Sequence, residues 1–186
     1  RDGTELRPLT TVGESYSPSW SPTGEWIAYR HSAAVWVIRP DGSGNRNVDL
    51  VEGSYGSQMP SWSPDGSRII HVRYTDSPSA TSEIFVMSAD GTNLTRLTYN
   101  ATEDSDPVFS PDGTRIAFSG KMFSGDDSRP QICIMKSDGT GARQLTSKGG
   151  THPSWSPDGR YLVYTREDPG CNSPGSGVLW IFDTRL

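Results

Sequence analysis

The side chains best suited to chemistry are acidic residues that gather in short polar segments. Glu103, Asp104 and Asp106 share one segment, and Asp126 and Asp127 share another. Carboxylate oxygens suit Ca²⁺, but these segments lack the alternating ligands and the central glycine of a dedicated calcium loop. They predict a solvated acidic rim without a cofactor. Calcium is the alternative, and its ligands would be Asp104, Asp106, Asp126 and Asp127.

Residues that could act as nucleophiles or bases form no recognisable group. Of the three histidines only His152, directly before Pro153, is placed as a site residue, whereas His71 lies in an apolar run and is expected to be packed. A zinc site needs three or four convergent ligands, and no suitable spacing is present. The Gly-x-Ser-x-Gly turn of many serine hydrolases is absent too. The sequence predicts no catalytic residues, and a hydrolase or lyase is the least supported alternative.

A repeated phrase organises the chain around these residues. Ser-Trp-Ser-Pro-Asp-Gly stands at 61–66 and 154–159, with close copies at 19–24 and 108–113, so it recurs every 42 to 47 residues. In each copy an aromatic residue ends a strand, proline fixes φ for a turn, and glycine accepts the positive φ that closes it. A period of this size, with several short strands per unit, is typical of β-propeller blades.

Each repeat is predicted to contain four short strands, which we name a to d in chain order. β-Branched and aromatic residues dominate these runs, and no stretch keeps an apolar period of 3.6 residues for three turns. The expected fold class is therefore all-β. We expect one propeller domain over residues 1–186 with four blades of four antiparallel strands. The repeats are about 13–51, 52–98, 99–146, and 147–186 plus 1–10.

Each end of the sequence carries part of a blade. Arg1–Thr10 matches Asp90–Thr98 and Asp138–Thr146, each a turn followed by strand d, whereas Val178–Phe182 matches strand c. Because an unpaired strand edge is a liability, we expect the N-terminal strand to complete the last blade. The closure takes place within one chain, as a monomer with four blades, or between two chains, as an end-to-end dimer with eight.

The connections between strands fall into two sets. The a–b and c–d turns are short and repeated, whereas the d–a and b–c loops vary in length and content. In an antiparallel meander the two sets lie on opposite faces, and variable loops on a rigid scaffold commonly carry binding. The d–a loops lie nearest the propeller axis. The residues expected to contact a ligand or partner are Glu14, Tyr55, Tyr99, Glu103, Asp104, Asp106 and His152.

The repeat unit resembles a known family. An aromatic residue followed by Ser-Pro-Asp-Gly-x-x-Ile-Ala-Phe, and then Ile-x-x-Met-x-x-Asp-Gly-Thr-x-x-x-x-Leu-Thr, is similar to the TolB-like propeller repeat, a WD-like repeat. The resemblance covers essentially the whole chain. It implies a propeller that binds protein partners in the cell envelope, and hence a periplasmic or secreted protein. The same repeat is found in propeller domains of prolyl-oligopeptidase relatives.

Composition narrows the class of partner. The net charge of −5 disfavours nucleic acid, and no apolar run approaches the roughly 18 residues that span a bilayer, so membrane insertion is not expected. The predicted function is a non-catalytic scaffold that presents its variable loops to a protein or peptide. The alternative is lectin-like binding of carbohydrate or another small ligand, for which tyrosines beside the loops would supply stacking faces.

The two cysteines carry little functional weight. Cys133 takes the strand position of Trp36, Phe85 and Trp180 in the other repeats, which predicts a buried thiol. Cys171 lies in a loop rich in glycine and proline. A disulfide between them stays open, because sequence alone does not give the required geometry.

Overall fold

Fifteen strands in four antiparallel sheets make up the regular structure of this computed structural model, which describes residues 6–11, 13–49, 56–75, 81–121, 129–167 and 177–185. The described residues contain no helix, so the predicted all-β propeller class is confirmed. The strands are β1 (Ser15–Trp20), β2 (Ile27–His31), β3 (Ala34–Ile38), β4 (Arg46–Asn47), β5 (Ser57–Trp62), β6 (Arg68–Tyr74), β7 (Ser82–Ser88), β8 (Thr95–Arg96), β9 (Ser105–Phe109), β10 (Arg115–Gly120), β11 (Gln131–Lys136), β12 (Arg143–Gln144), β13 (Thr151–Trp155), β14 (Tyr161–Glu167) and β15 (Gly177–Asp183).

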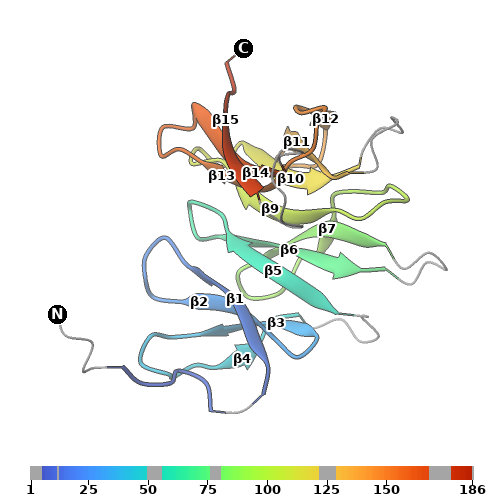
Figure 1. The fold of residues 1–186 in the computed structure, drawn as a ribbon. Helices are drawn as coiled ribbons and strands as arrows, with labels where there is room; N and C mark the ends of the chain where they lie inside the picture. The colour runs from blue at the N-terminus through green and yellow to red at the C-terminus, as the bar shows by residue number, and fades with distance from the viewer. Residues whose placement is uncertain are drawn as a thin grey trace.

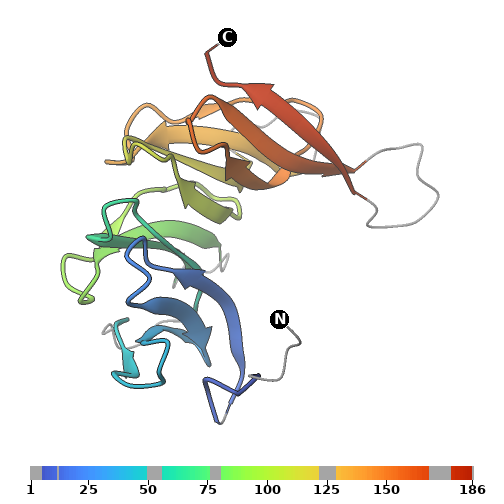
Figure 2. The same ribbon diagram turned by 90° about the vertical axis from the view of Figure 1, so that its left-hand side faces the viewer.

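The sheets follow one another along an arc (Figures 1 and 2). Blades 1, 2 and 3 are the sheets β1–β4, β5–β8 and β9–β12, each in sequence order, and blade 4 is the sheet β13–β15. The first strands lie along the inner side, because β5 contacts both β1 and β9, and β9 contacts β13. The fourth strands, β4, β8 and β12, are short and lie at the outer edges. Blades 1 and 4 stand at opposite ends of the arc.

The Ser-Pro-Asp-Gly phrase closes the first hairpin of a blade with a fixed set of hydrogen bonds. In blade 2 the Ser63 hydroxyl accepts from the Arg68 N–H at 2.9 Å and donates to the Asp65 carboxylate at 2.5 Å. Asp65 also accepts from the Ser67 N–H at 3.0 Å, and Gly66 closes the turn with a φ of 70°. The bonds from Ser63 and Ser67 lower the pKa of Asp65 to about 2. This aspartate is thus committed to the turn.

The hydrophobic core is divided among the interfaces between blades. Between blades 2 and 3, Ile84 and Val86 of β7 pack in one cluster with Ile116 and Phe118 of β10. Leu97, just after β8, belongs to the same cluster, so the outer strand of blade 2 also contributes to the seal against blade 3. Each interface therefore needs two blades and the outer strand of the first.

Residues 6–10 do not complete blade 4 of their own chain, and the expected closure within one chain is corrected. Leu9 packs against Ile27 and Ile38 of blade 1, and only residues 11–14 join it to β1. So short a connection holds residues 6–10 beside blade 1, at the far end of the arc from β15 (Figure 1). Among the described residues, no strand pairs with the outer edge of β15.

The burial of single residues differs between blades. Cys133 is buried in β11 as predicted, while Cys171 and its pairing lie outside the described residues. Of the aromatic residues that end the first strands, Trp62 and Phe109 are buried between blades, but Trp20 is 58% exposed. No helix in the described part of the chain is long and apolar enough to cross a membrane.

Candidate functional site

Each inner strand carries a β-bulge at the same place. The inner strands are β1, β5, β9 and β13. Near its start, each of them has one extra residue relative to the second strand of the same blade, so the pairing register shifts there. The residue before proline in each bulge has a φ between 51° and 53°, a region that residues other than glycine rarely enter. We call these four residues the bulge row: Ser17, Met59, Asp106 and His152.

The bulge row has one member on each of the four inner strands, and its members differ in chemistry. A bulge re-aims a side chain out of the regular alternation of a strand, so the same device recurs on neighbouring blades. The row holds a hydroxyl, a thioether, a carboxylate and an imidazole. The backbone cost of each left-handed residue is sustained by the sheet around it.

Asp106 and His152 form the pair at the C-terminal end of the row. The Asp106 carboxylate accepts from the hydroxyls of Ser105 at 3.0 Å and Ser119 at 3.1 Å, which fix its orientation. His152 Nε2 lies 3.8 Å from Asp106 Oδ1, and His152 Nδ1 lies 3.1 Å from the Thr151 hydroxyl. The His152 side chain is 70% exposed, whereas that of Asp106 is 16% exposed. The pair therefore places a carboxylate of fixed orientation beside a solvent-accessible imidazole.

Asp104 lies just before this pair but does not reach the surface. Its backbone N–H donates to the Ser82 carbonyl at 2.8 Å, and the Asn100 amide donates to its carboxylate at 2.8 Å. Burial raises the pKa of Asp104 to about 6, and the nearby charge of Glu83 acts in the same direction. Asp104 therefore joins blades 2 and 3 beneath the loop, and the expectation that it contacts a partner is corrected.

Glu83 is the second buried acid at this interface. It is paired with the Arg96 guanidinium at 2.9 Å and accepts from the Thr98 hydroxyl at 2.6 Å. A Cβ at Gly120 would come within 2.2 Å of Asp104 Oδ1, so the absence of a side chain there makes room for the buried carboxylate. These groups form a polar base that supports the d–a loop between blades 2 and 3.

The other predicted site residues are scattered. Glu14 and Glu103 are exposed on d–a loops. Tyr99 is exposed but points toward the outer strand, because its hydroxyl donates to the Arg96 carbonyl at 3.1 Å and the Arg96 guanidinium covers its ring at 4.7 Å. Tyr55, Asp126 and Asp127 lie outside the described residues. The structure thus brings together Asp106 and His152 from the predicted set.

Sequence reasoning missed Ser17 and Met59, the other members of the bulge row. A sequence pattern could have identified them, because in every repeat the bulge residue directly precedes a proline, and this proline stands two residues before the aromatic residue that ends the strand. As for a metal, no three His, Cys, Asp or Glu side chains converge suitably within the part of the chain that the structure describes.

A separate cleft of about 320 Å³ lies between blades 1 and 2, on the face of the repeated turns. Its walls include Trp26 and Arg46, whose guanidinium lies 5.1 Å from the indole ring. Two of its acids are turn residues, and Asp90 accepts from the Thr92 N–H at 2.9 Å. The polar groups here are largely committed to the fold, in contrast to the Asp106–His152 pair.

The geometry defines the chain as a run of β-propeller blades with a variable inner row. It belongs to the TolB beta propeller domain family, which it matches over residues 1–175. A TolB homolog of Chlorobium luteolum is 32% identical over 136 residues, which are 72% of this chain and 29% of that protein. The uncharacterized peptidase YuxL of Bacillus subtilis is 32% identical over 111 residues, 57% of this chain and 16% of that protein.

The crystal structure of TolB from Acinetobacter baumannii matches 98% of this chain with a TM-score of 0.75. Its sequence identity is 21%, so the likeness shows the fold alone, and 47% of that chain is covered. The chain thus spans less than half the length of each of these relatives.

Proposed function

We propose that this chain is a non-catalytic scaffold whose bulge row, with the d–a loops beside it, binds a protein or peptide segment. The observation that carries the proposal is that one strained backbone position is kept in four blades while its side chain changes each time. A position needed only for folding would be expected to keep a similar side chain. Variation on a constant frame is what a recognition surface requires.

The chemistry of the row favours a partner with a basic side chain beside an apolar one. Asp106 is a fixed carboxylate that suits a lysine or arginine, and Met59 offers a polarizable apolar contact. Glu14 and Glu103 are exposed acids on the neighbouring loops, and the net charge of −5 favours encounter with a basic segment. Membership of the TolB family supports export to the periplasm or cell exterior as part of the same proposal.

The test is a selection of random peptides displayed on phage against the purified chain, followed by calorimetry on the enriched peptides. We expect basic peptides whose affinity falls about tenfold or more in Asp106→Asn, because one charge-assisted contact contributes roughly 1.5–3 kcal/mol. His152→Ala should weaken the same peptides. Glu25→Gln is the matched control, since Glu25 is exposed on the opposite face.

Two results would count against the proposal. Peptides that bind equally well to Asp106→Asn, His152→Ala and the wild type would place the binding surface elsewhere. Binding of a neutral oligosaccharide that is lost in these variants would instead favour the lectin-like alternative.

A further inference from the structure

The cleft of about 320 Å³ between blades 1 and 2 has counterparts at the next two interfaces, where an arginine side chain of the protein itself takes the corresponding position. From this comparison we infer that the cleft is a second binding site, and that its ligand is an arginine side chain of a protein partner. The cleft lies on the face of the repeated turns, opposite the bulge row. The inference therefore does not depend on the proposed function of the bulge row.

At the two later interfaces an arginine covers the aromatic residue that ends the next inner strand. The Arg68 guanidinium of blade 2 lies 5.1 Å from the centre of the Phe109 ring of blade 3. The Arg115 guanidinium of blade 3 lies 4.7 Å from the centre of the Trp155 ring of blade 4. Arg115 also donates to the Gly159 carbonyl at 3.2 Å. Because the face of an aromatic ring attracts a cation, each arginine helps to seal its interface.

Trp26 is the equivalent residue of blade 1. Like Arg68 and Arg115, it stands five residues after the serine that begins the Ser-Pro turn. In all three blades the backbone N–H of this residue donates to the hydroxyl of that serine, at 2.9 or 3.0 Å. The next aromatic residue, Trp62, lines the cleft together with Trp26. This interface therefore has two indole rings where the later interfaces have one aromatic ring and one guanidinium.

Contacts within blade 1 hold the Trp26 ring. The Arg39 and Arg46 guanidinium groups lie 4.8 and 5.1 Å from its centre. Gly44, which lies between these two arginines in the sequence, comes so close that an added Cβ would be 2.9 Å from the indole. The ring is thus packed on the c–d turn of its own blade, and the cleft remains beside Trp62.

The blades are not more widely separated at this interface than at the others. A Cβ added at the glycine of each Ser-Pro-Asp-Gly turn would meet the proline of the preceding blade at a similar distance. The distances are 3.7 Å from Gly66 to Pro22, 3.3 Å from Gly113 to Pro64 and 3.7 Å from Gly159 to Pro111. The cleft therefore follows from the side chain at the Trp26 position, and it has the place that a guanidinium takes elsewhere in the molecule.

Two carboxylates in the walls of the cleft suit a cation. Asp65 and Asp90 accept hydrogen bonds within their turns, and the bonds from the hydroxyls of Ser63 and Thr92 contribute most to lowering the pKa of these acids. Both carboxylates are therefore ionised at neutral pH. The two bonds from Thr92 end on Oδ1 of Asp90, at 2.9 and 2.7 Å, so Oδ2 can accept from a guanidinium.

The third interface indicates how an arginine binds in the cleft. Its guanidinium lies over the Trp62 indole and donates to the Gly66 carbonyl, as Arg115 does with the aromatic ring and the glycine of blade 4. Other N–H groups of the guanidinium face Asp90. Lysine has the charge but not the planar group with several donors, so the site should prefer arginine.

Arg46, a cation in the same walls, is compatible with this ligand. Blade 3 has Lys136 at the position of Arg39 and Arg143 at the position of Arg46, and it still holds Arg115 over the next aromatic ring. The fold therefore accommodates a guanidinium at this place beside two cations of the c–d hairpin.

The experiment is a titration of the isotope-labelled chain, followed by the NMR signal of the Trp62 indole N–H. The probe is N-acetyl-arginine methylamide, and the citrulline compound of the same shape is the uncharged control. We expect saturable binding of the arginine compound with a Kd of about 1 mM, and binding of the citrulline compound that is at least about tenfold weaker. No saturable binding of the arginine compound, or equal binding of the two, overturns the inference.

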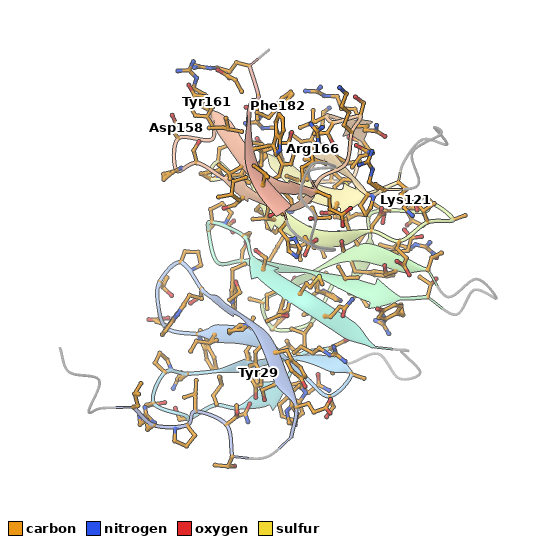
Figure 3. The ribbon with its side chains drawn as sticks, viewed as in Figure 1. Tyr29, Lys121, Asp158, Tyr161, Arg166 and Phe182 are labelled. Atoms are coloured by element: carbon orange, nitrogen blue, oxygen red, sulfur yellow. The ribbon has the colours of Figure 1, made fainter. Side chains whose placement is uncertain are left out.

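The decisive variant is Trp26→Arg, because it gives blade 1 the arginine that blades 2 and 3 have. We expect it to weaken binding of the probe by at least about tenfold, since the chain then fills its own cleft. Tyr161→Arg is the matched control: it makes the same kind of change at the equivalent position of blade 4. Figure 3 shows Tyr161 at the opposite end of the arc from Tyr29 of blade 1. Wild-type affinity in a folded Trp26→Arg variant overturns the inference.

A second pair of variants tests the charge and leaves the aromatic walls intact. Asp90→Asn should weaken binding about threefold to tenfold, while the asparagine oxygen still accepts from the Thr92 N–H and keeps the turn. Asp138→Asn makes the same change in the equivalent turn of blade 3 and should leave the affinity unchanged. Equal affinities of these two variants for the probe contradict the proposed site.

The source of the guanidinium is tested with two more probes. A blocked pentapeptide with arginine between glycines should bind more tightly than methylguanidinium, because only the peptide has the apolar stem that packs along the indole rings. Methylguanidinium that binds as tightly as the peptide would make a free small cation the ligand and overturn the assignment to a protein. Peptides bound at the bulge row lose affinity in Asp106→Asn but not in Trp26→Arg, so each site stands or fails separately.

Discussion

Equivalent positions of the repeat lie in different surroundings at the interface between blades 1 and 2 and on the outer face of blade 1. Trp62, at the interface, is 8% exposed and its indole N–H donates to the Ser19 carbonyl at 3.2 Å, whereas its counterpart Trp20 is 58% exposed. Gly91 and Gly42 share one turn position with φ values of 93° and 91°. The motif therefore determines the conformation within a blade, whereas the neighbouring blade determines how much each residue contributes to the free energy of unfolding.

The tryptophan pair should show the largest difference. We expect Trp62→Ala to lower the free energy of unfolding by about 3–5 kcal/mol, because it leaves a cavity between two blades, and Trp20→Ala to lower it by less than about 1 kcal/mol. Urea unfolding followed by circular dichroism measures both. Similar losses in the two variants would mean that the exposed tryptophan is buried in solution.

The glycine pair should show a smaller difference. An alanine at either position enters the left-handed region, which costs roughly 1–2 kcal/mol. At Gly91 the new Cβ would also come within 2.1 Å of the Val48 carbonyl oxygen, whereas at Gly42 nothing lies within 4 Å. We expect Gly91→Ala to cost about 1–3 kcal/mol more than Gly42→Ala, because packed backbone must shift. Equal unfolding midpoints would contradict the close approach of blade 2 to Val48.

Much of the fold could be predicted from sequence, because it follows from local chemistry. The turn phrase determines the hairpin through bonds such as that from Ser63 to Asp65, which recurs from Ser110 to Asp112 and from Ser156 to Asp158. The exposure of Trp20 could not be predicted, since it depends on whether a neighbouring blade is present. The closure within one chain was wrong for residues 6–10 for a similar reason. The motif identified a fourth strand but not the blade beside which a short connection holds it.

The candidate site was less predictable because burial separates residues that are adjacent in sequence. Asp104 and Asp106 stand two residues apart, but the bulge at Asp106 places the first between blades and the second beside His152. The alternation of apolar and polar residues does not predict such a bulge. The recurring residue before proline does predict it, once the repeats are aligned by their prolines rather than by their acidic residues.

Each of the two interfaces beside blade 2 buries a titratable group, Asp104 on one side and His71 on the other. Their pKa values shift in opposite directions, which gives the smallest predicted effect. Burial raises the pKa of Asp104 to about 6, so between roughly pH 4 and 6 the folded chain holds a proton that the unfolded chain releases, and stability falls as pH rises. Burial lowers the pKa of His71 to about 4, with Asp49 raising it and Arg73 lowering it further. Between about pH 4 and 6.5 the unfolded chain therefore binds more protons there, and stability rises with pH.

In the wild type these opposite dependences partly cancel, and removing one group at a time should reveal the other. Asp104→Asn keeps the shape of the side chain, so its stability should rise by up to about 2 kcal/mol between pH 4.5 and 6.5 because of His71. His71→Phe takes the residue that blade 3 has at the same position, Phe118, and its stability should fall by a similar amount over that range. Chemical unfolding at several pH values measures both slopes. Parallel slopes in the two variants would show that Asp104 and His71 are not the groups that titrate, whereas opposite slopes would assign one proton linkage to each side of blade 2.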